Sequence, residues 1–142
     1  MEKKYKLTEE TLEIDGHVLH CIIALRSFGK VKEGELGGWI EKESNLSHEG
    51  DCWIYNDAIV YGNAKVCGNA KVEKESDYIV FKNWWSSGRY FTWTRSNDMW
   101  SVGCFYGTGE ELIKKAYSDS EEKGREYERV VKYVESIKQE LK

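Results

Sequence analysis

The sequence predicts a mainly β protein with α structure at its C-terminal end. A six-residue repeat fills residues 50–73, an aromatic segment with alternating polarity follows it, and two amphipathic stretches close the chain. We therefore expect a short hexapeptide-type β-coil, then an antiparallel aromatic β-meander, and then two C-terminal helices.

The repeat reads GDCWIY, NDAIVY, GNAKVC and GNAKVE. Each unit opens with Gly or Asn, and it has a small residue third and an aliphatic residue fifth. The opening residue would supply left-handed backbone, and the aliphatic residue would point inward. Repeats of this kind build parallel β-helices. A pair of ordinary hairpins with Gly-Asn turns is the alternative interpretation.

Four units make little more than one coil of three hexapeptides, and a single coil buries little apolar surface by itself. Either flanking segments cap the coil or several chains pack together at this stretch. Hexapeptide coils commonly lie side by side in trimers, so we expect a homo-oligomer with a contact here.

Length and charge narrow the function classes. The chain has 142 residues, which suits one domain or two small ones. Its net charge of −4 does not favour binding to a DNA or RNA polymer. No apolar run approaches the ~20 residues of a membrane span, and the start MEKKYKLTEE is not a signal peptide, so we expect a cytoplasmic protein. The 4 cysteines show no CxxC spacing, which favours reduced thiols.

Turn and cap signals place the remaining elements. Asp15-Gly16 between apolar runs predicts a hairpin over residues 5–25. The polar residues 73–77 suggest a boundary between an oligomerising segment (1–75) and a ligand-binding domain (76–142). Three strands are expected, at 78–81, 89–95 and 99–106. Thr108 and Glu111 form a capping box for a helix to about residue 118, and Ser120 or Asp119 caps a second helix to about 138.

Catalysis has little support. The 3 histidines are His17, His20 and His48. His17 and His20 would face opposite sides of a strand, which disfavours a shared metal. We expect no catalytic residue, no metal and no cofactor, and therefore no enzyme. A hexapeptide-type acyltransferase remains an alternative, although such enzymes need several coils to frame a substrate.

The aromatic strand is the stronger signal. Arg89, Phe91, Trp93 and Arg95 share one face of the strand. Rings can stack on bases and guanidinium groups can grip phosphate. Asn97, in the following turn, can contact a base edge through its donor and its acceptor. The alternative is that Phe91 and Trp93 only pack under the helices.

Two arginines one helical turn apart, Arg125 and Arg129, allow two interpretations. They could clamp a phosphate that a partner subunit presents. They could equally belong to a solvated face that pairs with Glu122 and Glu126.

Residues 24–58, ALRSFGKVKEGELGGWIEKESNLSHEGDCWIYNDA, resemble the N-terminal segment of YdcK-like left-handed β-helix proteins through the GGW and GDCWIY motifs. This resemblance implies that residues 20–49 form an irregular entry to the coil. The present chain departs from that pattern because its repeats stop after four units.

The C-terminal half resembles the phage-encoded Thoeris anti-defence sponges, the first "Tad" family, in its order of an aromatic sheet, two helices and paired arginines on the last helix. The resemblance implies a protein that sequesters cyclic ADP-ribose signals of TIR-domain proteins, and in some members cyclic oligonucleotides, without degrading them. It implies ligands at the subunit interfaces of dimers or trimers of dimers. It matches Arg125 and Arg129 to the paired arginines and Asn97 to a ligand-reading asparagine.

These observations lead to one hypothesis and its rivals. We expect a phage anti-defence protein, in the cytoplasm of the infected bacterial host, that binds a small cyclic nucleotide. Phe91 and Trp93 would stack the base, and Arg95, Arg125 and Arg129 would neutralise phosphates. Arg26 and a Gly37-Gly38 turn could form a second anion site near a three-fold axis. The alternatives are a phage structural or adaptor protein that binds another protein through its aromatic face, and the acyltransferase.

Overall fold

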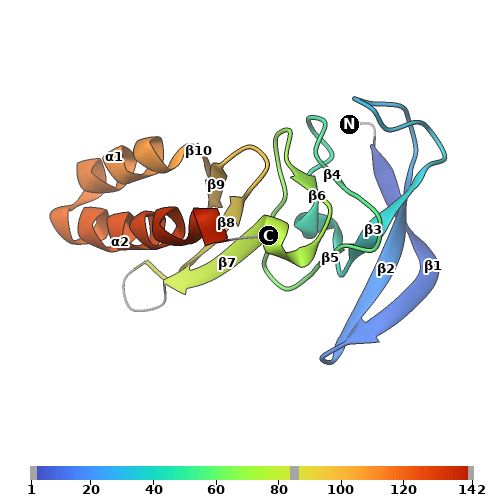
Figure 1. The fold of residues 1–142 in the computed structure, drawn as a ribbon, viewed down its shortest axis with the longest axis horizontal. Helices are drawn as coiled ribbons and strands as arrows, with labels where there is room; N and C mark the ends of the chain where they lie inside the picture. Colours follow the sequence, from blue (N-terminus) through green and yellow to red (C-terminus); the bar gives the residue numbers. More distant parts are fainter. Residues whose placement is uncertain (1–2, 84–86, 141–142) are drawn as a thin grey trace.

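The computed structural model describes residues 3–83 and 87–140 (Figure 1). The molecule is elongated, with the hairpin β1–β2 at one end, the two helices at the other and the repeat between them. Within the described ranges the strands are β1 (Tyr5–Ile14), β2 (His17–Ala24), β3 (Leu36–Ile40), β4 (Trp53–Ile54), β5 (Ile59–Val60), β6 (Lys71–Val72), β7 (Tyr78–Asn83), β8 (Arg89–Thr94), β9 (Met99–Val102) and β10 (Phe105–Gly107), and the helices are α1 (Gly109–Asp119) and α2 (Glu121–Ile137). The prediction of a mainly β chain with an antiparallel meander and two C-terminal helices is confirmed. Neither helix combines the length and the apolar composition that a membrane-spanning helix needs.

The predicted N-terminal hairpin is present. β1 and β2 pair antiparallel, and the turn between them has positive φ at Asp15 (49°) and Gly16 (83°). β3 continues this sheet on the other side of β2 and then pairs in parallel with β5. The N-terminal sheet is therefore joined directly to the repeat.

Residues 50–73, here called the repeat segment, have the predicted backbone and burial pattern. Their opening residues Gly50, Asn56, Gly62 and Gly68 all have positive φ, between 56° and 71°. The aliphatic fifth positions are all fully buried: Ile54, Val60, Val66 and Val72. The left-handed openings and inward aliphatic residues predicted from the sequence are both confirmed.

Strands of the repeat segment pair in parallel. Trp53 of β4 lies opposite Lys71 of β6, 18 positions later, which is three units of six. The backbone N–H of Tyr55 donates to the carbonyl of Val72 at 2.7 Å in the same ladder. The chain thus returns alongside itself after three units, and the alternative of antiparallel hairpins is wrong for these strands.

The same short turn occurs before and after the strands of the repeat segment, and it was not among the elements expected from the sequence. The segments EKESN (41–45) and EKESD (73–77) each contain a 3₁₀ turn, η1 (Glu43–Asn45) and η2 (Glu75–Asp77). In the first, Asn45 Oδ1 accepts from the backbone N–H groups of residues 41 and 42. In the second, Asp77 Oδ2 accepts from those of residues 73 and 74. The buried final side chain fixes each turn.

The meander has four antiparallel strands in the order β10-β9-β8-β7. The sequence predicted one strand over residues 99–106, and this prediction is wrong. The chain reverses at Gly103, which has φ 56°, so that β9 and β10 form a hairpin.

The meander separates two hydrophobic cores. Along β7, Ile79 and Phe81 pack with the helices, whereas Tyr78 and Val80 pack with the repeat segment. On β8 the backbone N–H of Lys65, in the repeat segment, donates to the Thr92 hydroxyl at 3.0 Å. One sheet thus has its two faces in two different cores.

Both predicted helix caps are confirmed. Thr108 Oγ1 accepts from the Glu111 backbone N–H, and Glu111 Oε1 accepts in return from that of Thr108. Ser120, rather than Asp119, caps α2 by accepting from the Lys123 backbone N–H. The buried face of α2 contains Gly124, Tyr127, Val130, Val131 and Val134.

Candidate functional site

A hollow of about 250 Å³ lies between the two helices and the end of the meander that holds the turn between β9 and β10. Apolar side chains from β9, β10, α1 and α2 form its walls, and charged side chains lie around them. Its lining residues are Arg89, Val102, Cys104, Phe105, Leu112, Lys115, Ala116, Asp119, Lys123 and Tyr127. We call this the helix-side hollow.

The rim of the helix-side hollow is positively charged. Three cations, Arg89, Lys115 and Lys123, face one carboxylate, Asp119, which gives a local charge of +2 in a chain whose net charge is −4. Lys123 Nζ lies 2.8 Å from Asp119 Oδ2, and this hydrogen bond holds the pKa of that carboxyl below its ordinary value. Within residues 3–83 and 87–140, Arg89 and Lys115 take part in no ion pair. Two cations are therefore available to an anion.

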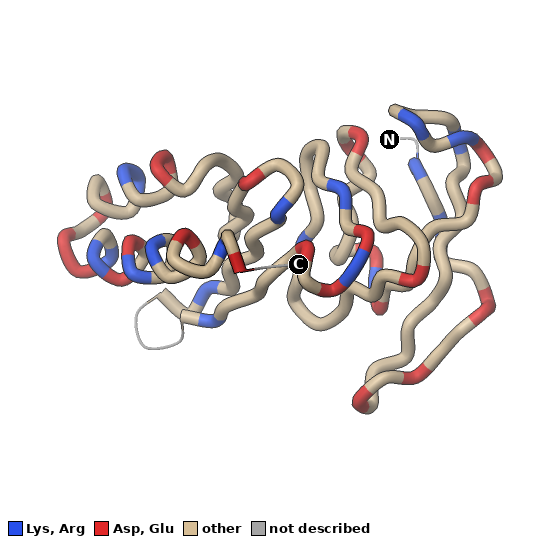
Figure 2. Tube along the Cα trace, viewed as in Figure 1, with Lys and Arg blue, Asp and Glu red and all other residues tan. Residues whose placement is uncertain are grey.

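Elsewhere along the two helices, acidic and basic residues are interspersed, so the excess of positive charge is local (Figure 2).

Tyr127, which lines this hollow, carries a buried polar group. The residue is 3% exposed, and its hydroxyl has no hydrogen-bond partner among the described residues. Leaving such a buried group unsatisfied costs ~1–3 kcal/mol, and native structures satisfy most of them.

The turn between β9 and β10 positions Arg89. A Cβ atom placed on Gly103 would collide with Nη1 of Arg89, so the guanidinium lies directly against the glycine backbone. The positive φ of Gly103 also favours glycine at this position. Gly103 therefore permits both the reversal of the chain and the position of the guanidinium group.

The two rings chosen from the sequence to stack a base are not available for it. Phe91 and Trp93 are 0% and 1% exposed and belong to the core beneath the helices. Trp93 Nε1 also donates to Asp98 Oδ1 at 2.7 Å, so its polar atom is already bonded. The prediction that these rings form an open stacking surface is wrong, because the helices cover the strand face that they share.

Asn97 and Arg95 hold the meander rather than line the hollow. Asn97 Oδ1 accepts from Thr94 Oγ1, and its Nδ2 donates to Asn69 Oδ1 and to the Tyr106 hydroxyl. Arg95 Nη1 lies 3.9 Å from Asp77 Oδ1, and the Arg95 side chain is partly buried. The amide that was expected to contact a base edge instead ties the turn after β8 to the repeat segment.

Arg125 and Arg129 are exposed on α2 and do not line the helix-side hollow. Arg129 Nη1 donates to Glu126 Oε1 at 2.7 Å, which fits the interpretation of a solvated, paired face. A phosphate clamp from these arginines would require a second subunit, and it stays a prediction.

The second predicted anion site is wrong in its geometry. Gly37 and Gly38 do not form a turn but lie buried in β3. A Cβ on Gly37 would collide with Trp53 and Ile22, so the glycines permit close packing. Arg26 Nη2 donates to the His48 carbonyl at 3.3 Å and stays in the N-terminal half.

The histidines make separate contacts. His17 Nδ1 lies 2.8 Å from Glu41 Oε2, and His20 Nδ1 lies 3.0 Å from the Thr8 carbonyl. In the part of the chain that the structure describes, no three His, Cys, Asp or Glu side chains are grouped to hold a metal ion.

The sequence alone did not identify the residues of the helix-side hollow. Arg89 was noted only as part of the aromatic strand, and Tyr127 was not proposed as a site residue. A tyrosine on an otherwise aliphatic face is a usable signal, because a buried phenol normally finds a partner for its hydroxyl. The lysines Lys115 and Lys123 gave no signal, since exposed lysines are frequent on any helix.

Comparison with known proteins gives a partial match. No protein-family model matches the chain. An uncharacterized acetyltransferase, YdcK, of Escherichia coli (strain K12) is 42% identical over 62 aligned residues. The match covers 38% of this chain and 19% of that protein, so the matched region spans about a fifth of the relative's length. The chain is thus similar to YdcK over a limited segment.

Proposed function

We propose that the protein binds a small anionic ligand of the cyclic-nucleotide class in the helix-side hollow and holds it without reaction. In this proposal it is a phage anti-defence protein that sequesters an immune signal in the host cytoplasm, such as a cyclic ADP-ribose isomer. The observation that carries the proposal is a hollow with apolar walls and a net positive rim, in which two cations take part in no ion pair within the described ranges.

Each part of the hollow suits one part of such a ligand. Phe105, which is partly exposed, offers apolar surface to the face of a base. The Tyr127 hydroxyl is enclosed in this structure, so a shift of its ring would bring it to a polar atom on the edge of the base. Arg89 and Lys115 can neutralise a phosphate at the rim. The carboxylate in the lining, Asp119, already accepts a hydrogen bond from Lys123, which suits a role in binding.

We also propose that the repeat segment forms one turn of a hexapeptide coil and that the protein is a homo-oligomer, either a dimer or a trimer of dimers. Parallel pairing after three units supports the coil. Exposed apolar side chains in and beside the N-terminal sheet support a contact between copies, since Val18 is 48% and Leu36 is 61% exposed. The mass of the protein in solution, by light scattering, tests this part.

Calorimetric titration tests the ligand. Cyclic ADP-ribose isomers, cyclic dinucleotides and cyclic trinucleotides would each be titrated into the protein, and ligand released by heating would be identified by mass spectrometry. We expect saturable binding of one member, its intact release, and loss of binding in Arg89→Ala. Lys30→Ala, which removes an exposed lysine outside the hollow, is the matched control. Binding of none of these nucleotides would overturn the proposal.

Two rivals keep specific support. The first is the adaptor, for which an aromatic binding face was expected. Phe91 and Trp93 of that face are buried, whereas the exposed residues Val18 and Leu36 suit an adaptor that binds through its N-terminal sheet. The name of the partial relative suggests an acyltransferase. A transferase would consume an acyl-coenzyme A in the presence of an acceptor, whereas the proposed binding protein would leave it unchanged.

A further inference from the structure

A second hollow, of about 210 Å³, lies on the other side of Arg89. It is enclosed by the repeat segment, by η1 and by the face of β8 and β9 that is turned towards the repeat segment. Its lining residues are Ser44, Asn63, Lys65, Gly88, Arg89, Tyr90, Thr92, Ser101 and Gly103. We call this the repeat-side hollow.

Polar residues form a larger share of the lining of the repeat-side hollow than of the lining of the helix-side hollow. It has two cations, Lys65 and Arg89, several hydroxyl groups and an amide, and no carboxylate. Lys65 is exposed and takes part in no ion pair within the described ranges. Cations and hydroxyl donors without a competing anion are the groups that bind phosphate oxygens.

Arg89 connects the two hollows, because its side chain lines both. Gly103 leaves room for the guanidinium group, since a side chain at this position would displace it. Neither hollow alone reaches the ~300–1,000 Å³ of a typical small-molecule site, so a larger ligand would have to extend past Arg89.

From this geometry we infer that the repeat-side hollow is a phosphate subsite, in which Lys65 and Arg89 hold a phosphate group of a ligand whose base occupies the helix-side hollow. The ligand class is therefore a nucleotide with two phosphate groups, or a diphosphate, that can contact Arg89 from both sides. The position of the base rests on the proposed function. Phosphate binding at Lys65 does not depend on the proposed function.

Inorganic pyrophosphate is the first probe. We would titrate it into ¹⁵N-labelled protein and follow the amide resonances of Lys65, Ser101 and Gly103. We expect saturable shifts that are lost in Lys65→Ala and kept in Lys30→Ala. Lys65→Ala should fold normally, because only the backbone N–H of Lys65 bonds to Thr92 and the side chain is exposed. Unchanged binding in Lys65→Ala would overturn the inference.

Nucleotides are the second probe. Lys65→Ala should weaken binding of cyclic di-AMP about tenfold, which is the loss expected for one charge-assisted hydrogen bond, and should leave 5′-AMP unaffected. If pyrophosphate binds at Lys65 and no nucleotide binds, the phosphate subsite stands and the proposed function falls. If nucleotides bind and Lys65→Ala changes none of their affinities, the subsite falls and the proposed function stands.

Discussion

The ring of Tyr127 meets the ring of Phe91 edge-on, with the two centroids 4.6 Å apart and the planes at 70°. This contact joins α2 to β8 and fixes the tyrosine ring at the base of the helix-side hollow. Phe91 therefore serves the candidate site indirectly: it supports the residue whose hydroxyl would contact the ligand.

Tyr127→Phe should separate ligand binding from stability. The change removes only the unpartnered hydroxyl, so we expect the free energy of unfolding to stay the same or to rise by up to ~1 kcal/mol. Affinity for the ligand should fall several-fold. Urea unfolding and calorimetric titration measure the two effects. Phe91→Leu is the control, because it should lower stability by damaging the core. A clear loss of stability in Tyr127→Phe would show that the hydroxyl is satisfied within the fold.

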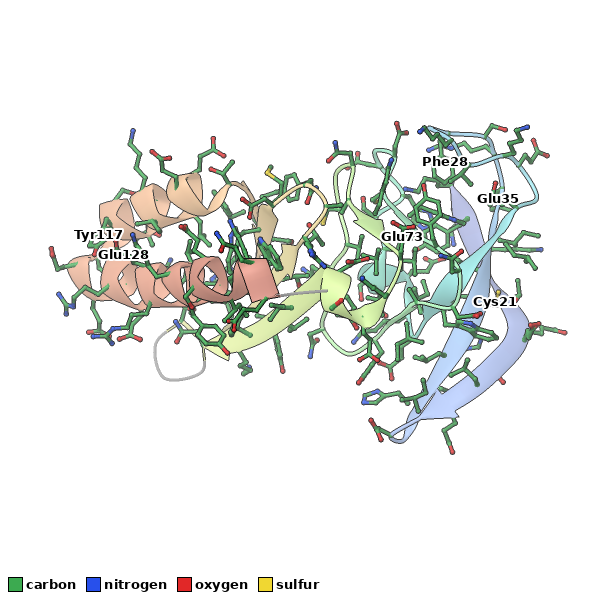
Figure 3. All side chains as sticks on the ribbon, viewed as in Figure 1. Cys21, Phe28, Glu35, Glu73, Tyr117 and Glu128 are labelled. Carbon is green, nitrogen blue, oxygen red and sulfur yellow. The ribbon has the colours of Figure 1, made fainter. Side chains whose placement is uncertain are left out.

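Gly124→Ala should destabilise the protein although alanine is the better helix former. A Cβ at Gly124, in α2, would collide with the ring of Tyr117, which belongs to α1 and packs against α2. Overpacking costs ~1–3 kcal/mol, more than the ~1 kcal/mol gained from helix propensity. The Tyr117 hydroxyl donates to Glu128 Oε1 at 2.7 Å, and Figure 3 shows the two side chains meeting between the helices.

The contact between Gly124 and Tyr117 is tested by urea unfolding. The variants to compare are Gly124→Ala, Tyr117→Ala and the double variant. In the Tyr117→Ala background, Gly124→Ala should become stabilising, because the ring it meets is gone. Glu122→Ala, on the exposed face of the same helix, should change the free energy of unfolding by less than ~0.5 kcal/mol. Destabilisation by Gly124→Ala in both backgrounds would assign the effect to something other than Tyr117.

Asn97→Ala should lower stability and leave the ligand affinity of the folded protein unchanged. The side chain makes three hydrogen bonds, and two of them go to Asn69 and to the Tyr106 hydroxyl. Their loss should cost ~1–3 kcal/mol in urea unfolding. A large fall in affinity with unchanged stability would restore the ligand-reading role expected from the sequence.

Stability should fall as the pH is lowered from about 7 to 5, through His48. Burial lowers the pKa of this imidazole below its ordinary value of 6.5. The ring stacks on Tyr5, and its Nδ1 accepts from the Lys4 backbone N–H at 3.1 Å. Because the unfolded chain takes up the proton more readily, the stabilisation is present above pH 6.5 and is lost as the pH falls below it.

Urea unfolding at several pH values between 5 and 7.5 measures this effect. His48→Gln should be less stable at pH 7.5 and should show a flatter dependence on pH. An equal slope in wild type and variant would contradict the assignment to His48. The pKa of Glu41 is also lowered, by its hydrogen bond to His17, but that carboxyl affects stability only below about its ordinary value of 4.5.

Replacing Arg125 and Arg129 together by alanine tests whether a partner subunit completes the site. Both are exposed on α2, outside the helix-side hollow, so binding within one subunit should be unaffected. A loss of affinity by orders of magnitude would instead support the predicted phosphate clamp at a subunit interface. Light scattering on the same variant distinguishes loss of the clamp from loss of the oligomer.

Local signals in the sequence predicted much of the fold. The Asp15-Gly16 turn, the Thr108–Glu111 capping box and the inward positions of the repeat depend on residues close together in the chain, and all are present. The matching turns EKESN and EKESD could also have been found by comparing the chain with itself. Such features need no knowledge of which elements meet.

The candidate site depended on contacts that no local pattern reports. Alternation placed Phe91 and Trp93 on one face, but it did not tell which face the helices cover. The tight reversal at Gly103 interrupts an apolar run that otherwise has strand periodicity, so one strand was expected where two occur. Arg89 and Tyr127 are brought to the same hollow only when α2 packs on the meander.

The meander also determines how the molecule should melt. Its strand β7 contributes side chains alternately to the core beneath the helices and to the core of the repeat segment, and β8 is bonded to the repeat segment through Thr92. If either core is exposed, one face of the meander loses its cover. The other core, which packs on the opposite face of the same sheet, is then destabilised as well. A protein with two separate cores would ordinarily show two heat-absorption peaks in a calorimeter. Here the shared sheet couples them into a single cooperative unit, and one peak is expected.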